Sequence, residues 1–328
     1  MKGNLLVTGA SGFLGYHLVQ AAVSAGYSVF AGVRPSSDTA HFAPSAITRL
    51  NLDFSDVPAL TRMLAEHRIS HVIHAAASTK AKDQAAYNRA NADYTRNIAL
   101  AAMATGVPLE KFVFISSLAA LGPSRSGEPI RENNQPHPVT WYGNSKLLAE
   151  QYLRDIAGLP LIGLRPTAVY GPREKDLLVL IKTLCKGLEV YIGRNSQRLS
   201  FVYVRDLADV TVKSLESERT GEFYNVSDGN IYDRYAFSNA AKQATGRKTV
   251  KLQLPLPLIT RIAGLMDILY SRSAKTPVLN RDKINELTAS DWSCSIEKIN
   301  RDLGFRPAYD LQRGMNETIS WYKSQHWI

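Results

Sequence analysis

The chain has 328 residues, of which 45% are hydrophobic and 21% are charged. These values are typical of a soluble globular protein that is large enough for one big domain or two interleaved ones. The net charge is +10, but the Lys and Arg residues are dispersed, without a basic run or interleaved aromatic residues. This dispersed distribution of positive charge argues against nucleic acid as a partner. It favours anionic small molecules or weak attraction to a membrane surface.

The cysteine content and the N-terminal sequence further limit the kinds of protein that this chain can be. Cys185 and Cys294 are too few for a disulfide scaffold or a zinc site, so we expect free thiols and no bound metal. The chain opens directly into an apolar strand, without the charged region and cleavage site of a signal peptide. No stretch reaches about 18 uninterrupted apolar residues. We therefore expect a cytoplasmic protein without an integral membrane segment.

The first predicted unit is a strand, a glycine-rich turn and a helix. An apolar strand at 4–8 leads into Gly9, Gly12 and Gly15, and a helical pattern follows through Ala25. A dinucleotide-binding turn requires this context, because its glycines permit the tight turn, the approach of a pyrophosphate and close packing of helix on strand. Free N–H groups at the helix N-terminus would hold the phosphates. The residues of this turn expected to contact a cofactor are Gly9, Ser11, Gly12, Phe13, Leu14 and Gly15.

The second predicted strand, 27–33, ends at Arg34 rather than at an acidic residue. An enzyme selective for NAD usually carries an Asp or Glu here to bind the ribose 2′-hydroxyl, whereas the first acid after this strand is Asp38. A guanidinium would pair with the 2′-phosphate of NADP, which a carboxylate would repel. The sequence thus favours NADP(H) over NAD(H). The alternative is that Arg34 is a solvated residue at the end of a strand.

Asp53 and Phe54 follow the next apolar segment. The Asp53 carboxylate could accept a hydrogen bond from an adenine amino group. It could equally cap the helix that begins near Asp56. We include both residues among the expected cofactor contacts.

Strand 71–77 ends in small residues, among them Ala75 and Ala76, which would let a cofactor lie close to the backbone. His74 in the same strand is expected to be a structural histidine with satisfied hydrogen bonds. The helix predicted at 87–105 carries Asn91 and Thr95 on one face.

Strand 111–117 ends in two hydroxyl residues, Ser116 and Ser117, at the carboxyl edge where ligands collect in parallel sheets. The alternation of strands and helices up to this point predicts an α/β fold with a doubly wound parallel sheet of the Rossmann type. Residues 122–138 are rich in Gly, Pro, Ser and Asn and predict a loop that could cover a site.

Tyr142 and Lys146 come next, four residues apart on a predicted helix, so that they lie on one face. In that position the Lys146 ammonium is expected to lower the pKa of the phenol from about 10 toward about 7. A phenol tuned in this way can give or take a proton at a carbonyl or carbinol. The pair becomes a specific signal because a nucleotide-binding turn and the Ser117 hydroxyl precede it.

These motifs together resemble the extended short-chain dehydrogenase/reductase family, in order across about two thirds of the chain. The C-terminal part is similar in layout only. The motifs are the Thr8–Gly15 turn, Asp53, His74-Ala75-Ala76, Ser117, Tyr142-x-x-x-Lys146 and Arg165–Pro172. The resemblance implies that Tyr142 is the general acid/base, that Lys146 binds the nicotinamide ribose and tunes Tyr142, and that Ser117 hydrogen-bonds the substrate oxygen. It also implies cofactor contacts at Gly9, Gly12, Gly15, Arg34, Asp53, Asn91, Ser116 and Pro166.

Three departures separate the chain from the nucleotide-sugar branch of the family. Ala168 stands where that branch places an Asn, and Leu199 stands where it places an Arg, with Arg198 displaced by one. Leu118-Ala119 replaces the Asp-Glu pair of dehydratases. The chain therefore looks more like the dihydroflavonol-reductase and 3β-hydroxysteroid-dehydrogenase-like branches. We expect NADP(H)-dependent interconversion of a secondary alcohol and a ketone on a small, non-nucleotide substrate. The alternatives are an NAD-dependent nucleotide-sugar epimerase or dehydratase, and a cofactor sensor without turnover.

The predicted division places the dinucleotide-binding domain at 1–172, with 198–228 returning to it. A smaller α+β substrate domain comprises 173–197 and 229–328. Within it, the apolar segment 255–270 predicts a helix packed on that domain, or alternatively an apolar entrance or a membrane-surface patch. Cationic residues that could bind an anionic substrate group, or that are simply solvated, are Arg173, Lys175, Arg194 and Arg198. The family resemblance implies a homodimer, formed through helices such as 87–105 and 142–155.

Overall fold

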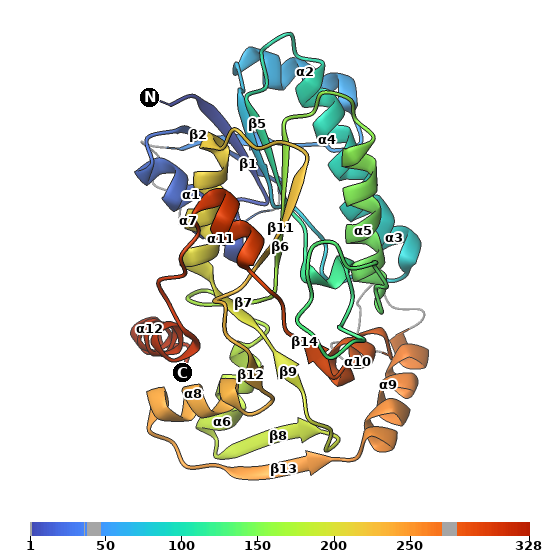
Figure 1. Ribbon diagram of the computed structural model, residues 1–328, viewed down its shortest axis with the longest axis vertical. Coiled ribbons are helices and arrows are strands. Elements are labelled where there is room, and N and C mark those ends of the chain that lie inside the picture. The colour runs from blue at the N-terminus through green and yellow to red at the C-terminus, as the bar shows by residue number, and fades with distance from the viewer. Residues whose placement is uncertain (1, 36, 38–46, 271–280) are drawn as a thin grey trace.

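The computed structural model describes residues 2–35, 37, 47–270 and 281–328, and its central element is a parallel sheet (Figure 1). Asp38 lies outside these residues. The sheet has seven strands in the order β11-β6-β5-β4-β1-β2-β3, and every adjacent pair is parallel. The strands are β1 (Asn4–Thr8), β2 (Ser28–Val33), β3 (Ile47–Asn51), β4 (His71–His74), β5 (Lys111–Ile115), β6 (Leu161–Pro166) and β11 (Glu222–Val226). The predicted doubly wound fold is confirmed, and all seven carboxyl ends meet at one edge.

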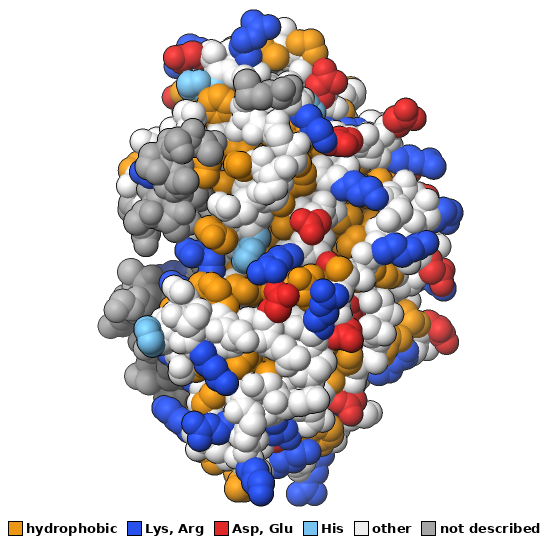
Figure 2. Space-filling view, turned by 90° about the vertical axis from the view of Figure 1, so that its left-hand side faces the viewer, with side chains coloured by type: hydrophobic (Ala, Val, Ile, Leu, Met, Phe, Trp, Pro, Cys, Tyr) orange, Lys and Arg blue, Asp and Glu red, His pale blue; other side chains and the backbone are white. Residues whose placement is uncertain are grey.

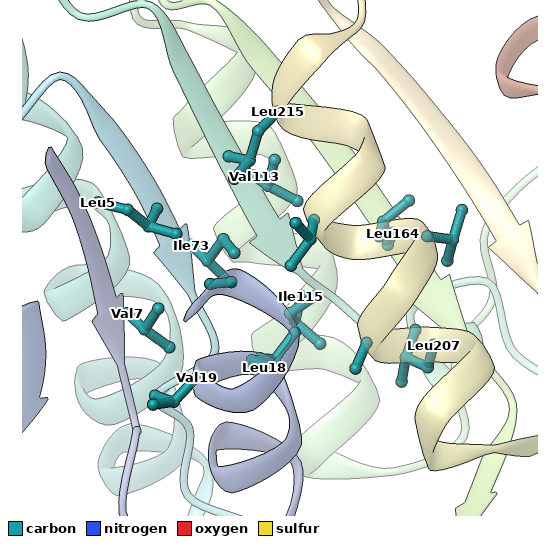
Figure 3. Close-up of a cluster of buried hydrophobic side chains, with 14 of the residues drawn as sticks. Leu5, Val7, Leu18, Val19, Ile73, Val113, Ile115, Leu164, Leu207 and Leu215 are labelled. Carbon is teal, nitrogen blue, oxygen red and sulfur yellow. The ribbon is translucent and has the colours of Figure 1, made fainter. Parts of the chain in front are cut away.

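Helices cover both faces of the sheet, because alternate side chains of each apolar strand point to opposite layers. Leu5 and Val7 belong to the core on one face (Figure 3), whereas Leu6 between them belongs to the core on the other. Each such fully buried side chain stabilises the fold by about 1.5–3 kcal/mol. One face is covered by α1 (Phe13–Ser24), α7 (Val204–Lys213) and α11 (Glu297–Leu303), and the other by α2 (Val57–Glu66), α4 (Tyr94–Met103) and α5 (Trp141–Arg154).

The remaining segments build a smaller α+β part, below the sheet in Figure 1. Its core contains Tyr170, Tyr203, Met315 and Tyr322. Its helices are α6 (Leu178–Cys185), α8 (Ala236–Thr245), α9 (Leu256–Tyr270), α10 (Arg281–Thr288) and α12 (Leu311–Ser324). Its strands are β7 (Ala168–Tyr170), β8 (Leu188–Ile192), β9 (Arg198–Leu199), β10 (Phe201–Tyr203), β12 (Tyr232–Asp233), β13 (Val250–Leu254) and β14 (Asp291–Trp292). None of the helices in the described part of the chain is long and apolar enough to cross a membrane.

One predicted element differs from the structure. The single helix predicted at 87–105 is instead α3 (Gln84–Asn88), a π-helical turn at Arg89–Asp93, and α4. By contrast, α9 spans almost all of the predicted 255–270 helix.

The division into two domains stays a prediction. The helix α11 does not follow it, because its sequence position and its packing place it in different domains. The return of segment 198–228 to the sheet is seen in β11, which pairs with β6. However, Ile299 and Leu303 of α11, which we assigned to the substrate domain, are buried in the same core as residues of α1 and α7.

The glycine turn shows why β1 and α1 can pack so closely. Gly9 has φ of +68°, a left-handed conformation that favours glycine. A Cβ on Gly15 would lie 2.0 Å from the Gly9 carbonyl oxygen, so any side chain there would push the helix off the strand. A Cβ on Gly12 would lie 3.2 Å from that same oxygen, a tight contact that a shift of a few tenths of an ångström would relieve.

We predict that Gly15→Ala destabilises the protein by about 3 kcal/mol, because the clash is with backbone that cannot move alone. Gly12→Ala, with ordinary backbone angles and only one tight contact to relieve, should cost about 1 kcal/mol or less. Thermal unfolding measures the difference as a melting temperature about 5 °C lower for Gly15→Ala. Equal melting temperatures for the two variants would contradict this account of the turn.

Candidate active site

Ser117, Tyr142 and Lys146, predicted from the sequence as the catalytic residues, converge at the carboxyl edge of β5. Ser117 begins the 3₁₀ turn after β5, where its hydroxyl accepts from the Ala119 N–H at 3.2 Å. The same side chain is hydrogen-bonded to the Tyr142 hydroxyl. One helical turn after Tyr142, the Lys146 ammonium donates to the Ile115 carbonyl at 2.8 Å. A hydroxyl pair with an adjacent buried cation is thus built from two elements.

Gly143 is the reason why the two elements approach so closely. The Thr140 hydroxyl caps α5 by accepting from the Gly143 N–H at 3.0 Å. A Cβ on Gly143 would lie 2.4 Å from the Ala119 carbonyl oxygen. The backbone of α5 therefore lies directly against the turn that carries Ser117, and no larger residue fits between them.

The pKa of Tyr142 corrects our expectation. Loss of hydration raises the pKa of this phenol far above its usual value, and the Ser117 hydrogen bond offsets the rise only in part. Burial lowers the pKa of Lys146 to about 7, although Glu150 acts in the opposite sense. Because the Lys146 ammonium bonds to Ile115 and is itself only partly charged near neutral pH, it does not bring the Tyr142 pKa toward 7 in the protein alone. Tyr142 is therefore protonated at neutral pH, which suits a proton donor.

A chain of hydrogen bonds fixes His74, which is structural as predicted. Its Nδ1 lies 2.8 Å from the Thr8 hydroxyl and its Nε2 lies 2.9 Å from the Thr95 hydroxyl. Thr95 donates its only proton to the Asn91 carbonyl at 2.7 Å, so the imidazole must donate from Nε2 and accept at Nδ1. Burial lowers the His74 pKa to about 3, which keeps this neutral tautomer. The Thr8 hydroxyl in turn accepts from the Ala76 N–H at 3.2 Å.

Asn91 lies in the π-helical turn and is fully buried. Its Oδ1 accepts from the Ser78 N–H at 2.7 Å, and its Nδ2 donates to the Ser78 carbonyl and to the Ser145 hydroxyl. The amide therefore ties the segment after β4 to α5, beside Tyr142. An extra residue in a helical turn often marks a functional site, and here it aims the amide inward. A direct contact of Asn91 with a cofactor stays a prediction.

Ser116 is held by a buried ion pair that the sequence did not reveal. Its hydroxyl donates to Glu150 at 2.6 Å, and Glu150 receives two hydrogen bonds from the Arg165 guanidinium, at 2.8 and 2.5 Å. Both charged side chains are almost completely buried. The hydroxyl of Ser116 is thus used within the protein, and any contact with a cofactor would fall to its backbone.

The remaining predicted cofactor residues lie along the carboxyl edge of the sheet, most of them after β1, β2, β3 or β4. Gly12 is the N-cap of α1 without a capping side chain, so the first N–H groups of the helix are left for a ligand. Arg34 is exposed directly after β2. Asp53 is exposed and accepts from the N–H and hydroxyl of Ser55, which lowers its pKa, while the helix cap is Asp56. Ser11, Phe13, Leu14, Phe54, Ala75 and Ala76 are half-buried along this edge, and Pro166 ends β6.

These residues fit a dinucleotide. The glycine turn places backbone N–H groups and a helix N-terminus at the point where an anionic pyrophosphate would be bound. Arg34, after the neighbouring strand β2, adds a cation for the ribose 2′-phosphate. Lys146 and Tyr142 lie further along the same edge, after β5.

The predicted loop 122–138 is pinned to the C-terminal part of the chain. Ile130 pairs with Cys294 through a backbone bridge. The Arg198 guanidinium donates to the Gly127 carbonyl and pairs with Asp291 at 3.2 Å. The loop is therefore fixed beside the site. The Arg198 guanidinium is engaged by Gly127 and Asp291 and is not free to bind an anionic substrate group.

Comparison with known proteins agrees with this geometry. Residues 5–227 match the model of the NAD dependent epimerase/dehydratase family. The chain belongs to this family. It is accordingly an NAD(P)-dependent enzyme of the extended short-chain dehydrogenase/reductase type, as the motifs predicted.

Three curated members of the family match along almost the whole chain. A ceramide reductase of Caulobacter vibrioides is 28% identical over 100% of this chain and 96% of its own length. An undecaprenol-linked N-acetylglucosaminyl 4-epimerase of Escherichia coli O157:H7 is 26% identical over 98% and 96%. A 3β-hydroxysteroid dehydrogenase/Δ5→4-isomerase of Mycobacterium tuberculosis is 24% identical over 98% and 91%.

Solved structures of other proteins share the fold. The UDP-glucose 4-epimerase of Thermotoga maritima, solved with UDP-glucose, aligns with a TM-score of 0.81 over 98% of this chain and 99% of its own, at 22% identity. The protein gox2253 aligns with a TM-score of 0.80 over 98% of both chains, at 26% identity.

Sequence reasoning missed Gly143, Thr140 and the Glu150–Arg165 pair. A glycine inside a predicted helix was a usable signal, because it costs about 1 kcal/mol there and suggests close packing. Thr140 was recognisable as an N-cap type of residue. The pairing of Glu150 with Arg165 joins a helix to a strand and leaves no local trace in the sequence.

Gly143→Ala should reduce turnover at least tenfold while cofactor binding changes little, because the methyl group moves Tyr142 away from Ser117. Asn144→Ala, at the exposed neighbouring position, is the matched control. Single-turnover rates and nucleotide titration separate the two effects. Wild-type turnover in Gly143→Ala would show that the close approach of α5 to the Ser117 turn is not needed for catalysis.

Proposed function

We propose that the enzyme reduces a ketone to a secondary alcohol with NADPH, and catalyses the reverse reaction, on a substrate that is not a nucleotide sugar. The observation that carries this proposal is the protonated Tyr142 phenol, hydrogen-bonded to Ser117 and lacking any carboxylate in the turn behind it. A neutral phenol beside a hydroxyl can polarise a carbonyl oxygen and then donate a proton to it.

The division of labour follows from the side chains. The glycine turn, Arg34 and Lys146 would hold a nicotinamide cofactor, which when bound would supply the hydride that reduction requires. Ser117 and Tyr142 hold the substrate oxygen, and Tyr142 gives up its proton to that oxygen as negative charge develops. Lys146, one helical turn from Tyr142, would favour the Tyr142 phenolate that remains whenever its amine is protonated.

Several residues argue against the epimerase or dehydratase alternative. Leu118 and Ala119 are buried apolar residues where a dehydratase needs an acid and a base. Arg198, the nearest match to the arginine of the sugar-nucleotide enzymes, is already paired with Asp291. The similarity to an undecaprenol-linked 4-epimerase keeps this alternative worth testing.

The substrate we favour is a lipid ketone. Ceramide reductase and 3β-hydroxysteroid dehydrogenase are both named for lipid substrates, and they match this chain over nearly its full length. The helix α10, which packs through Ile284 against apolar residues of β8, β13 and α9, also borders the start of α5 through the Asp282–Trp141 hydrogen bond.

We also propose a cytoplasmic homodimer in which α4 and α5 form the interface. Met103 at the end of α4 and Trp141 at the start of α5 are both exposed apolar residues. Light scattering of the purified protein gives the mass directly, and the mass of a single chain would contradict the dimer.

For the cofactor, we expect the protein to be purified empty and to bind NADPH at least tenfold more tightly than NADH, because Arg34 would pair with the 2′-phosphate. Arg34→Glu should reverse the preference, and Arg49→Glu, on the neighbouring strand β3, serves as the charge-matched control. Denaturation and nucleotide analysis check the bound state, and titration checks the preference. Stoichiometric NAD⁺ released from the protein would support the epimerase alternative instead.

Tyr142→Phe should keep NADPH affinity and lose nearly all turnover on a panel of steroid and acyl ketones, since the proton donor is gone. Ser117→Ala should lose less, because one of two groups on the oxygen remains. Stopped-flow measurement of NADPH oxidation compares them. A near wild-type rate in Tyr142→Phe would remove this residue from the acid/base role.

A further inference from the structure

We propose that the outer face of the β8–β13 ribbon, together with the first turns of α9, docks on the surface of an anionic lipid bilayer. The ribbon is the end of the molecule most distant from the main sheet in Figure 1. Docking itself is independent of the reaction, whereas its use for a lipid substrate rests on the proposed function.

The ribbon presents a continuous apolar stripe to water. Its two strands are parallel, with Leu188 opposite Val250 and Val190 opposite Leu252. Paired residues in a parallel ladder lie on the same face, so these four side chains stand together. Val250 is 71% exposed, and Leu188 and Leu252 are each 45% exposed. A contiguous exposed patch of this kind marks a surface that contacts something apolar.

The opposite face of β8 explains why the stripe cannot turn inward. Glu189, between Leu188 and Val190, is buried and pairs with Lys242 of α8 at 2.9 Å and with the Thr249 hydroxyl at 2.8 Å. Tyr191 also faces inward and is hydrogen-bonded to Glu189. Because strand side chains alternate, this buried ion pair holds the apolar residues on the outside.

The same end of the molecule is strongly basic. Both strands begin at one end of the ribbon, where Lys186 precedes β8 and Arg247 and Lys248 precede β13, all three exposed. Segments 178–192 and 236–262 contain a single acid, the paired Glu189. Their seven cations are Lys182, Lys186, Lys242, Arg247, Lys248, Lys251 and Arg261. Figure 2 shows Lys and Arg side chains gathered at this lower end, with few acidic ones among them.

Charge decides which partner fits. Exposed apolar side chains surrounded by Lys and Arg match an anionic bilayer. The apolar side chains can enter the lipid acyl chains, and the Lys and Arg side chains are attracted to the anionic headgroups. A second copy of this chain would bring the same cations to the contact, and like charges repel. The bilayer is therefore the occupant that both features favour.

The stripe continues toward the active site. Ile192 and Leu254, the last pair of the ribbon, pack with Ile259 of α9 and Ile284 of α10. Leu258 and Ile262, four residues apart on α9, are exposed on one side of that helix.

On α10, beside these residues, Asp282 accepts a hydrogen bond from the backbone N–H of Trp141 at 2.9 Å. The charge of Glu286 contributes to the raised pKa of Tyr142. Buried apolar contacts thus connect the docking stripe with α10, and α10 borders Tyr142, so docking would hold the bilayer on the α10 side of the site.

The test is flotation of the full-length protein with vesicles, in the absence of cofactor and substrate. The protein should bind vesicles of phosphatidylcholine with phosphatidylglycerol at least tenfold better than vesicles of phosphatidylcholine alone. Raising the salt from about 0.1 M to about 1 M should reverse much of the binding, because screening weakens the headgroup contacts. Val250→Ser/Leu252→Ser should reduce binding at least tenfold without lowering the melting temperature, since both side chains already face water.

Ile231→Ser, at another exposed apolar residue outside the ribbon, is the matched control and should bind like wild type. Arg247→Glu/Lys248→Glu should abolish the preference for phosphatidylglycerol. Absence of vesicle binding by the wild type, or equal binding by Val250→Ser/Leu252→Ser, would overturn the proposal. The proposal would also fail if the wild type did not bind vesicles and Val250→Ser/Leu252→Ser changed the oligomeric mass. That result would show that the stripe is a contact between copies of the chain. Because no turnover is measured, failure of docking is distinguishable from failure of the reductase reaction.

Discussion

Direct contact between backbones, permitted only by glycine, is the constraint on which the site depends. At Gly15 the first helix lies against the turn that follows β1, and at Gly143 the helix with Tyr142 lies against the turn that follows β5. Neither contact leaves room for a single methyl group. The first sets the distance between helix dipole and sheet edge where a dinucleotide is bound, and the second sets the distance between the two hydroxyls. The catalytic geometry therefore follows from how closely whole elements can approach.

Dehydration then determines the chemistry of the side chains at that edge. It drives Tyr142, Lys146 and His74 toward their neutral forms, each by the same physical cause. Nearby, Glu150 is paired with Arg165, whose guanidinium bonds to both carboxylate oxygens. Breaking such a buried pair by removing one partner typically costs about 3–5 kcal/mol. Burial thus favours the neutral forms of Tyr142, Lys146 and His74, whereas the buried side chains of Glu150 and Arg165 are matched to each other.

The sequence was sufficient where a signal is local. The strand, the turn and the first helix follow one another within about twenty residues, and Tyr142 and Lys146 are separated by one helical turn, so both were predictable. The structure differed where the cause is distant in the chain. A π-helical turn at Asn91 depends on partners at Ser78 and Ser145, and the position of the Ser116 hydroxyl depends on Glu150. The Tyr142 pKa depends on how much water the assembled fold removes, which no spacing of residues reports.

The burial of α11 in the first core has a consequence for the order in which the chain can fold during synthesis. Ile299, Leu303 and Phe305 complete the layer that covers one face of the sheet, but they are made near the end of a 328-residue chain. Until then the nascent sheet exposes part of that face, and contacts between residues so far apart in sequence form slowly. The nucleotide-binding half can therefore complete its core only after residues 297–305 have been synthesised.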